Sequence, residues 1–445
     1  MFAHGTFRCC VVCCAVLGVE FGTPSGCASF FVPILRNRRA RHMANTNLSQ
    51  AKKAKKDEFY TQYSDIEAEM NAYVEYNPDV FRGKTILLPC DDPEWSEFTR
   101  YFATNFTRFG LKKLISTSYA KGAGNLQLTL FETESPLYDP AKHETRGKLF
   151  TLTHDTDGSG NIDTDDIEFQ GYLEGDGDFR SPEVCKLRDE ADIIITNPPF
   201  SLFREFLAWI MEVQKKFIII GNKNTITYKE VFPLLKNNMM WVGYTPVSKD
   251  MLFSVPDDIR KKMLDSKKLG STYRIVDGKV MGRSPSLWFT NIDHGKRHEI
   301  LQLDTMVHNL KFNNKLKKKF EMEYGVAEYP RYDNYDAIEV PFTECIPSDY
   351  DGVMGVPITF LDKYNPEQFE ILGATQRGCH DGFPDTKKYD DYWEMCQDGR
   401  RTGSSGNKTN ENANIKCNDG RKNYFINAAG EIIQSAYQRI FIRRK

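Results

Sequence analysis

Short apolar runs alternate with longer amphipathic stretches between residues 84 and 222 of the chain. The runs are bounded by polar or turn-forming residues, which is typical of strands buried in a parallel sheet; they are KTILLPC (84–90), KKLIST (112–117), ADIIIT (191–196) and KFIIIG (216–221). Two stretches between them have helical spacing: residues 93–110, with Trp95, Phe98, Phe102, Phe106 and Phe109 before a stop at Gly110, and residues 201–214, with Phe203, Phe206, Leu207 and Ile210. Strands that alternate with helices predict an α/β fold with a doubly wound sheet.

The alternation is interrupted in two places. Residues 120–170 form a polar, Gly-rich insertion, and beyond about residue 300 the pattern changes to mixed sequence rich in Tyr and Pro. Residues 398–414, DGRRTGSSGNKTNENAN, have the composition of a flexible loop. We therefore expect one domain over residues 43–300, which includes the insertion at 120–170, and a second region over residues 301–445.

Residues 1–42 differ from the rest of the chain. FRCCVVCCAVLGVEFGTPSGCASFF (7–31) imitates a secretory signal, and the basic segment LRNRRARH (35–42) follows it. Met43 then opens a polar lead-in that is typical of a cytoplasmic domain. The first 42 residues are either a targeting segment or the product of an upstream start codon. We favour the upstream start, and we expect a cytoplasmic protein in which residues 1–42 are not part of the fold.

Composition excludes some classes of protein and leaves others open. The chain has 445 residues and a net charge of −2, so it has room for two or three domains and is no histone-like polycation. A local basic groove remains compatible with this charge; the candidate stripes are AKKAKK (51–56), RKKMLDSKK (260–268) and KLKKKF (315–320). No apolar run is long enough for a membrane span.

The cysteines indicate a reducing compartment. Five of them precede residue 30 and the others are scattered, which is not the pattern of a disulfide framework. Cys379, His380, Cys396 and Cys417 could be considered as zinc ligands, but their spacing is irregular and no CxxC pair is present. We expect free thiols and no metal.

The run ADIIIT ends in Asn197-Pro198-Pro199-Phe200, residues that are poor at packing a core, and a helical pattern starts directly afterwards. Ligands of open α/β sheets bind beyond the carboxyl ends of strands. There the Asn oxygen and the next carbonyl, held by the prolines, can accept both hydrogens of one exocyclic amino group, and Phe200 can stack on a planar ring. This arrangement suits methyl transfer to the weakly nucleophilic N6 of adenine, which must leave the base stack. The alternative is a plain strand-to-helix turn; the pure isoleucine strand before it favours the catalytic interpretation.

Further stretches carry a family resemblance: KDEFYTQYSDIE, LPCDDPEWSEFTRYF, GLKKLISTSY, LEGDGDFRSPEV, ITNPPFSLFREF, IIGNKNTITYKEVFPLL, YDNYDAIEV, GVMGVPITFLDKYNPEQFEILG and RIFIR. From Met43 to the C-terminus the chain resembles the EcoRI-type adenine-specific DNA methyltransferases. The resemblance implies a Rossmann-like methyltransferase domain over residues 43–300 and a target-recognition region over residues 301–445. It also implies S-adenosyl-L-methionine as methyl donor and double-stranded DNA as substrate. The enzyme would be the partner of a restriction endonuclease in restriction-modification, or would act alone.

The resemblance also implies roles for individual residues. Asn197, Pro198 and Phe200 would hold the target adenine, with Pro199 in the same motif. Residues on three other segments would contact the cofactor: Asp178 and Phe179 at its adenine, Tyr60 and Thr61 from the opposite side, and Pro89, Asp91 and Asp92 in the turn after the first strand. Amino-methyltransferases usually have a Gly-rich turn there, so the contacts to the methionine end of the cofactor stay open, and Asp92 could instead cap the next helix. Trp288 and Phe289 are either a second stacking face or buried strand aromatics.

Two other patterns imitate functional sites. DTDGSGNIDTDD (155–166) matches a calcium-binding EF-hand loop, but it has Asp166 where a bidentate Glu is usual, and its flanks are strand-like. We expect a Gly/Asp-rich hairpin here and no calcium. Pro89-Cys90 could suggest a cysteine nucleophile of a cytosine-C5 methyltransferase, but Asp91 and Asp92 disfavour a thiolate beside them.

Alternatives to DNA adenine methylation remain. The same motif could serve an RNA methyltransferase or a protein-glutamine methyltransferase, although the latter usually has Tyr in place of Phe200. The chain could also be an inactive DNA-binding module of the same fold; the intact Asn197, Pro198 and Phe200 speak against that. The recognition sequence depends on which side chains reach base edges, and no spacing rule predicts it.

Overall fold

The computed structural model describes residues 60–93, 96–120, 135–143, 145–255, 257–265, 268–375, 383–405, 410–420, 423–436 and 438–445. Our expectations for residues 1–42, for AKKAKK (51–56), for Trp95 and for Cys379 and His380 fall outside these ranges. Within them, no helix combines the length and the hydropathy that crossing a membrane requires.

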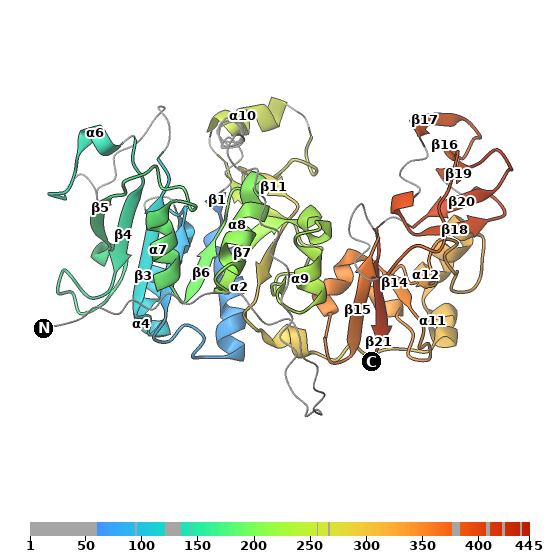
Figure 1. Cartoon of the computed structure of the whole chain (residues 1–445), viewed down its shortest axis with the longest axis horizontal. Helices are drawn as coiled ribbons and strands as arrows, with labels where there is room; N and C mark the ends of the chain where they lie inside the picture. Colours follow the sequence, from blue (N-terminus) through green and yellow to red (C-terminus); the bar gives the residue numbers. More distant parts are fainter. Residues whose placement is uncertain are drawn as a thin grey trace, which may run out of the picture. The chain divides into compact units, whose positions relative to one another are not determined.

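The main sheet has the strand order β5-β4-β3-β2-β6-β7-β12-β8 (Figure 1). Its centre is parallel, since β2 (Thr85–Pro89) pairs in parallel with β3 (Lys113–Ser118) and with β6 (Ile193–Thr196), and β6 pairs in parallel with β7 (Lys216–Asn222). β12 (Ser286–Thr290) runs antiparallel between β7 and β8 (Trp241–Val242). The four strands predicted from apolar runs are therefore confirmed, and they are neighbours in one sheet.

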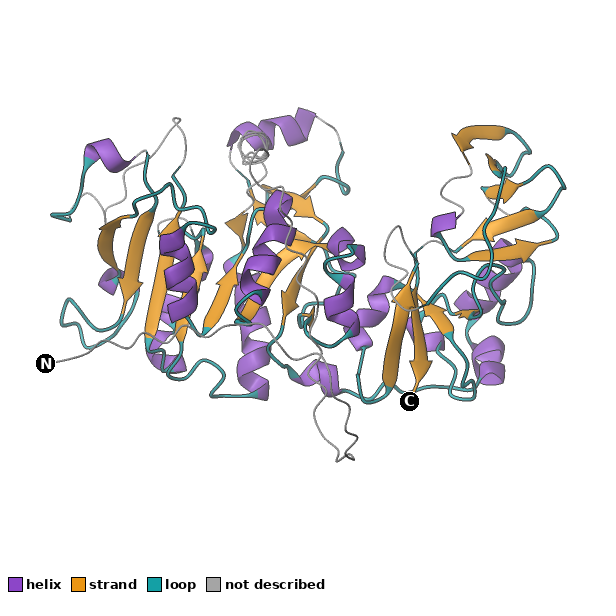
Figure 2. Ribbon diagram, viewed as in Figure 1, coloured by secondary structure: helices purple, strands orange, loops and turns teal. Residues whose placement is uncertain are grey.

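Helices cover both faces of the main sheet (Figure 2), and side chains along the central strands alternate between these two layers. Leu87 and Ile194 belong to a hydrophobic cluster with residues of α7 (Pro182–Glu190) and α8 (Phe203–Met211). Ile86 and Ile193 belong to a second cluster with residues of α2 (Tyr63–Tyr76), α3 (Glu97–Thr104) and α4 (Phe106–Phe109). Adjacent residues thus face opposite clusters, as the pleat requires. The predicted doubly wound α/β arrangement is confirmed.

The helix predicted over residues 93–110 is divided in two. Asn105 leaves the helical conformation (φ −102°, ψ 11°), and its side-chain Nδ2 donates to the carbonyl of Tyr101 at 2.9 Å. A short polar side chain that takes a backbone acceptor competes with the helix in this way. The four phenylalanines of the pattern are nevertheless buried, and Gly110 ends α4 in the left-handed conformation (φ 63°). The second predicted helix begins with a 3₁₀ turn at Phe200–Leu202 before α8.

The polar insertion contributes to the main sheet. β4 (Lys148–Leu152) pairs antiparallel with β3, and β5 (Glu168–Tyr172) pairs antiparallel with β4. The EF-hand-like segment 155–166 is the loop of this hairpin, with a 3₁₀ turn at Thr164–Asp166. The expected strand-like flanks and hairpin are confirmed. α6 (Pro140–His143) precedes β4.

A second, four-stranded antiparallel sheet has the order β1-β9-β11-β10. It contains β1 (Tyr60–Thr61), β9 (Met251–Ser254), β10 (Tyr273–Val276) and β11 (Lys279–Ser284). Helix α10 (Asp257–Asp265) joins it through a small cluster of Met263, Val255 and Tyr273. This sheet connects the N-terminal strand to a segment almost two hundred residues later.

Residues beyond 300 form two further sheets and short helices. One sheet has the order β13-β14-β21-β15 and the other β17-β16-β19-β20-β18. Their bounds are β13 (Ile338–Glu339), β14 (Met354–Val356), β15 (Phe369–Ala374), β16 (Trp393–Met395), β17 (Arg401–Ser405), β18 (Asn414–Cys417), β19 (Tyr424–Ile426), β20 (Ile432–Ser435) and β21 (Ile440–Arg444). The helices are α11 (Met306–Phe312) and α12 (Asn314–Lys319), while α9 (Phe232–Lys236) lies earlier in the chain. The hydrophobic cluster that includes α8 also contains Phe320 and Ile442, so buried contacts extend across the boundary that we predicted near residue 300.

Glu69 on α2 anchors the helix that follows β1. Its carboxylate is fully buried and accepts hydrogen bonds from the backbone N–H of Tyr244 (2.7 Å) and of Thr245 (2.8 Å), and from the hydroxyls of Thr245 and Tyr73. Burial raises the pKa of Glu69, although these donors oppose that effect. Gly243 is required beside it, because a Cβ there would lie 2.2 Å from Oε1 of Glu69.

We expect Glu69→Ala to lower the free energy of unfolding by about 2–4 kcal/mol, since it leaves two part-buried backbone N–H groups without their acceptor and opens a cavity. Urea unfolding measures the loss. Glu67→Ala is the matched control, because Glu67 is exposed on the same helix, and its effect should stay within about 0.5 kcal/mol. Equal losses in the two variants would contradict the anchoring role of Glu69.

Candidate active site

The candidate site lies where the central strands end. β3 lies on one side of β2 and β6 on the other, so the direction of winding reverses between β2 and β6. In open α/β sheets, ligands bind at the carboxyl ends of strands beside this reversal. Asp91 follows β2 and Asn197 follows β6, and the sequence analysis selected both residues.

Asn197 is held by the N-terminal strand. Its Nδ2 donates to Oγ1 of Thr61 at 3.4 Å, although the two residues are 136 positions apart. Thr61 is 5 % exposed and pairs across β1 and β9 with Phe253, which is fully buried. The structure thus brings together two segments that the sequence analysis assigned to the adenine and to the cofactor. Tyr60 contributes to the same strand through its backbone pairing with Ser254.

The other three residues of the motif differ in burial. Pro198 is buried, whereas Pro199 and Phe200 are half-buried. The ring of Phe200 packs against the edge of the cluster beneath α2 and α3 and keeps part of its surface accessible. Prolines in this position fix the backbone and remove two N–H donors, so the local polar groups of the motif are acceptors.

Asp91 joins the two strand ends. Its Oδ2 accepts a hydrogen bond of 2.6 Å from the hydroxyl of Thr196, the residue before Asn197, and its Oδ1 accepts one of 2.7 Å from Ser96. The Thr196 hydroxyl also lies 2.9 Å from the carbonyl of Pro89, but it has one proton, which the charged acceptor attracts more strongly. Asp91 is 8 % exposed. Each carboxylate oxygen thus has a protein donor, and the two hydrogen bonds connect the turn after β2 to the end of β6 and to the start of α3.

The start of α3 is also fixed by this turn. Ser96 is the N-cap, and its hydroxyl oxygen accepts from the N–H groups of Phe98 and Thr99. The alternative that Asp92 caps this helix is therefore wrong: Asp92 contributes its carbonyl, which accepts from the N–H of Ser96 at 2.8 Å. Asp92 is half-buried and stays a candidate cofactor ligand.

Cys90 has a conformation that glycine usually adopts, with φ 86°. It stands at the turn where amino-methyltransferases were expected to have a Gly-rich sequence. Positive φ costs a residue with a side chain about 1–2 kcal/mol. The backbone shape of a Gly-containing turn is therefore present here without the glycine.

Asp178 and Phe179 lie close to the start of α7 but do not present an open face. Phe179 is 3 % exposed and its ring packs edge-on against Phe206 and Trp209 of α8, so only its main chain could contact a ligand. Both oxygens of Asp178 accept from Arg180, which also forms an ion pair of 2.7 Å with Glu205. Burial alone would raise the pKa of Asp178, but the hydrogen bonds from Arg180 outweigh it and lower that pKa.

A groove of about 570 Å³ adjoins Asn197 through Thr61. It is lined by Thr61, Gln62, Tyr63, Ser64, Glu97, Arg100 and Ser254. Glu97 and Arg100 stand on α3 with opposite charges 3.4 Å apart, and the Arg100 guanidinium lies 5.5 Å from the centre of the Tyr63 ring. The volume is in the usual range for a small-molecule site.

Trp288 and Phe289 are buried strand aromatics, one on each face of β12. Trp288 packs against Phe98 and Phe289 packs against Phe203, and neither side chain is exposed. Of the two roles left open for them, core packing is confirmed.

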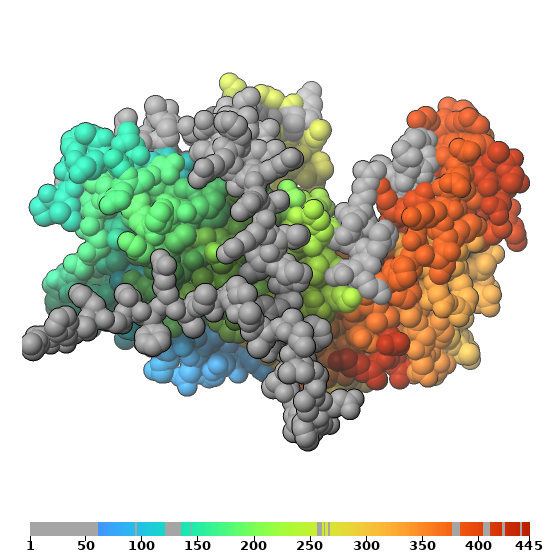
Figure 3. Space-filling model, in the orientation of Figure 1, coloured from blue at the N-terminus to red at the C-terminus, as the bar shows by residue number. Residues whose placement is uncertain are grey.

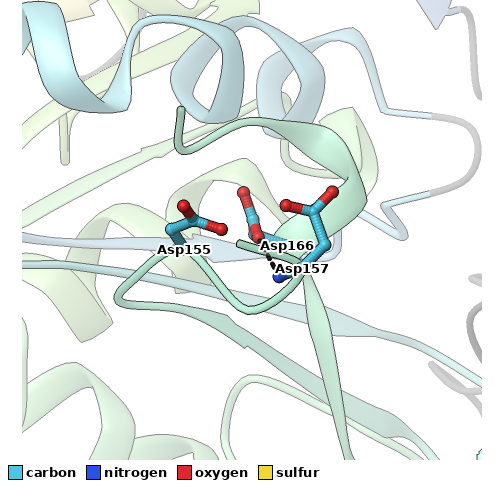
Figure 4. A group of neighbouring side chains, drawn as sticks. All are labelled: Asp155, Asp157 and Asp166. Carbon is cyan, nitrogen blue, oxygen red and sulfur yellow. Dashed lines mark hydrogen bonds between the residues drawn. The ribbon is translucent and has the colours of Figure 1, made fainter. Parts of the chain in front are cut away.

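The EF-hand-like loop brings Asp155, Asp157 and Asp166 together, with one oxygen of each within 4.8 Å of the others (Figure 4). These carboxylates accept hydrogen bonds from the loop itself. Asp155 accepts from the N–H groups of Gly158 and Gly160, and Asp166 accepts from Thr156 and from the N–H of Asp163. The acidic cluster therefore has an intramolecular role in shaping the hairpin loop.

Comparison with known proteins decides the family. The model of the EcoRI adenine-specific methyltransferase family matches residues 47–445. The chain belongs to this family. It is 42 % identical to the type II methyltransferase M.EcoRI of Escherichia coli, over 75 % of this chain and 90 % of that protein.

Two mycoplasma proteins are also similar to this member of the EcoRI methyltransferase family. The type II methyltransferase M.MpnI of Mycoplasma pneumoniae is 33 % identical over 73 % of this chain and 84 % of its own length. M.MgeORF184P of Mycoplasma genitalium is 36 % identical over 73 % of this chain and 85 % of its own length. No solved structure matches the chain significantly. Family membership makes the chain an adenine-specific DNA methyltransferase.

The sequence analysis missed several residues that shape this EcoRI-family site. Thr196, Ser96 and Arg180 were not selected, nor were Glu97 and Arg100. Thr196 had a detectable signal, because a hydroxyl at the end of an otherwise isoleucine strand needs a partner when it is fully buried. The acceptor, Asp91, is 105 residues away, and no local pattern indicates that pairing.

We expect Thr196→Val to lower the free energy of unfolding by about 1.5–3 kcal/mol, because it removes a hydrogen bond to a buried carboxylate and preserves side-chain shape. It should also lower kcat for methyl transfer, since Thr196 precedes Asn197. Thr196→Ser keeps the hydroxyl and should lose only about 1 kcal/mol of packing and little of kcat. Denaturant unfolding and single-turnover rates test both variants. A valine variant as stable and as active as the serine variant would show that the Asp91 link is dispensable.

Proposed function

We propose that this methyltransferase transfers a methyl group from S-adenosyl-L-methionine to N6 of an adenine that is flipped out of duplex DNA, at a specific sequence and as part of restriction-modification. The observation that carries the proposal is the position of Asn197-Pro198-Pro199-Phe200. The motif follows the buried strand β6 at the point where winding reverses, and its asparagine is oriented by Thr61.

The roles of the motif follow from its contacts. Because Nδ2 of Asn197 donates to Thr61, the plane of the side-chain amide is restrained, and its oxygen is the end suited to accept an N6 proton. The adjacent carbonyl, held by the prolines, accepts the second. Two such bonds favour a pyramidal nitrogen whose lone pair points at the methyl group. Phe200 provides the accessible ring surface on which the flipped base stacks, so positioning supplies most of the catalysis.

The groove beside Thr61 supplies fitting groups for the methyl donor. S-adenosyl-L-methionine ends in an ammonium and a carboxylate, and Glu97 and Arg100 offer one charge of each sign on the groove wall. A partly solvated ion pair contributes little stability. The ion pair between Glu97 and Arg100 can therefore be replaced by ion pairs with the ammonium and the carboxylate of the ligand. We assign them to the methionine end of the donor. Asp92, and the main chain at Asp178 and Phe179, remain the candidates for the rest of it.

Residues 301–445 are proposed as the target-recognition region. Lys315, Lys317 and Lys318 are exposed on α12, in the basic stripe KLKKKF (315–320) that the sequence analysis selected, and Lys311 is exposed on α11. Such cations contact phosphates and contribute affinity rather than sequence information. Base readout would then come from other side chains of this region. A cognate restriction endonuclease is the expected functional partner.

The first test is methyl transfer itself. The protein starting at Met43 is incubated with labelled S-adenosyl-L-methionine and mixed-sequence duplex DNA, and the labelled nucleoside is identified. We expect N6-methyladenine, and we expect Asn197→Ala to reduce its rate by about 100-fold or more with donor binding retained. Label in RNA or in glutamine would move the substrate to another class. Donor binding without any methyl transfer would indicate an inactive module.

A second test addresses Glu97 and Arg100. We expect Arg100→Gln to weaken binding of S-adenosyl-L-methionine about tenfold, or about 1.4 kcal/mol, and to leave binding of 5′-methylthioadenosine unchanged because that compound lacks the amino-acid end. Calorimetry measures both affinities. Arg108→Gln is the matched control, since Arg108 is exposed on α4 outside the groove. If Arg100→Gln weakened both compounds equally, the assignment to the methionine end would be wrong.

A further inference from the structure

The sheet β1-β9-β11-β10 has one covered face and one open face. Its pairing register places Met251, Phe253, Tyr273 and Thr61 on the same face, and these residues are buried. Since side chains alternate along a strand, the residues between them point the other way. That second set is Leu252, Ser254, Arg274, Val276, Lys279, Met281 and Arg283, each of which is half-buried or exposed. We call these seven residues the open face.

The open face adjoins the active site. The chain leaves the main sheet after β8 and returns to it at Ser286, which pairs with Asn222, the last residue of β7. The segment therefore projects from the carboxyl edge of the main sheet, the edge that carries Asn197. It is joined to Asn197 by contacts as well, since β9 pairs with β1, and Thr61 of β1 accepts the hydrogen bond from Asn197. Ser254 belongs both to the open face and to the groove.

The charge of the open face is positive. Arg274 and Lys279 are exposed, and they are diagonal neighbours, because Arg274 pairs with Met281 and Lys279 pairs with Val276; such neighbours lie about 7–8 Å apart. Neither forms an ion pair with any other described residue. Arg283, in contrast, is bound to Asp250. Asp277, in the turn between the strands, and Asp265, on α10, are exposed acids.

Apolar side chains accompany Arg274 and Lys279, while α10 packs on the covered face through Met263, which contacts Tyr273. Arg260 and Lys261 are exposed on α10, which lies at the surface in Figure 3 (yellow-green, top). Val276 is 40 % exposed and Ile275, at the end of the covered face, is 55 % exposed. The unpaired Arg274 and Lys279, with aliphatic side chains beside them, complement a phosphate backbone with its sugars. They do not form the broad apolar patch that a protein partner or a membrane would need.

We propose that the open face binds the phosphate backbone of duplex DNA beside the flipped adenine. Arg274 and Lys279 contact phosphates, and Val276 and Met281 lie against the deoxyribose. The inference rests on the proposed function, because it requires DNA as substrate. It adds a second region of DNA contact, within the methyltransferase part of the chain, to the region proposed beyond residue 300. This contact holds the duplex next to Asn197 while the base is out of the stack.

The test is DNA binding as a function of salt. The double variant Arg274→Ala/Lys279→Ala is titrated with a fluorescent duplex at several salt concentrations, in parallel with the unchanged protein. We expect the slope of log Kd against log salt concentration to fall by about 2, or about 0.9 for each phosphate that the variant no longer neutralises. Affinity should fall several-fold on all sequences alike. Affinity for S-adenosyl-L-methionine should not change.

Two controls make the result decisive. Lys112→Ala/Lys186→Ala removes the same charge from exposed positions just before β3 and on α7, and it should leave the slope unchanged. Arg274→Glu/Lys279→Glu should weaken binding further than the alanine pair. The inference is overturned if the alanine pair keeps the salt slope of the unchanged protein and instead aggregates, because the cations would then serve to protect the edge strand β10. It is also overturned if both alanine pairs lower the slope equally. Failure of the proposed function is distinct: the unchanged protein would then not methylate DNA at all.

Discussion

The carboxylate of Asp91 joins two strands at the position where chemistry is expected. β2 and β6 are hydrogen-bonded neighbours only near Ile86 and Leu87, so their carboxyl ends are free to diverge. Asp91 prevents this, because one of its oxygens binds Thr196 at the end of β6 and the other binds Ser96 at the start of α3. A buried carboxylate requires such donors, and a strand end that has to hold a substrate requires rigidity. The same interaction meets both requirements.

Asn197 is consequently fixed from two directions. Thr196 connects its backbone to β2, and Thr61 restrains its side-chain amide. Thr61 is itself positioned by β9 and by α2, which the buried Glu69 fastens to the loop after β8. The position of this one side chain therefore depends on segments near residues 61, 91, 196 and 253. This explains why the N-terminal strand is part of the site even though it lies far from the motif in the sequence.

The sequence predicted the parts of this arrangement that are local. Continuous isoleucine runs with helical patterns between them determine strands and layers, so β2, β3, β6 and β7 were all foreseen. The break at Asn105 was not foreseen. It depends on a side-chain rotamer that lets Asn105 donate to a carbonyl of its own helix, and the periodicity of the sequence does not show that rotamer. The contribution of β4 and β5 to the main sheet was hidden by their polar loop. The contact between Thr61 and Asn197 was reachable only through family resemblance, since a hydrogen bond across 136 residues leaves no spacing to detect.

Which cations can bind DNA also depends on contacts between segments that are far apart in the sequence. A net charge of −2 says little about DNA, because phosphates respond to the few cations within a Debye length of them. Several cations of this chain are engaged by nearby carboxylates: Arg180 by Asp178, Arg283 by Asp250 and Arg100 by Glu97. Other cations are available for an anionic partner because strand pairing places them away from carboxylates. Arg274 and Lys279 on the open face are examples. Strand pairing, and not the abundance of Lys and Arg in a segment, therefore determines which cations can take part in binding.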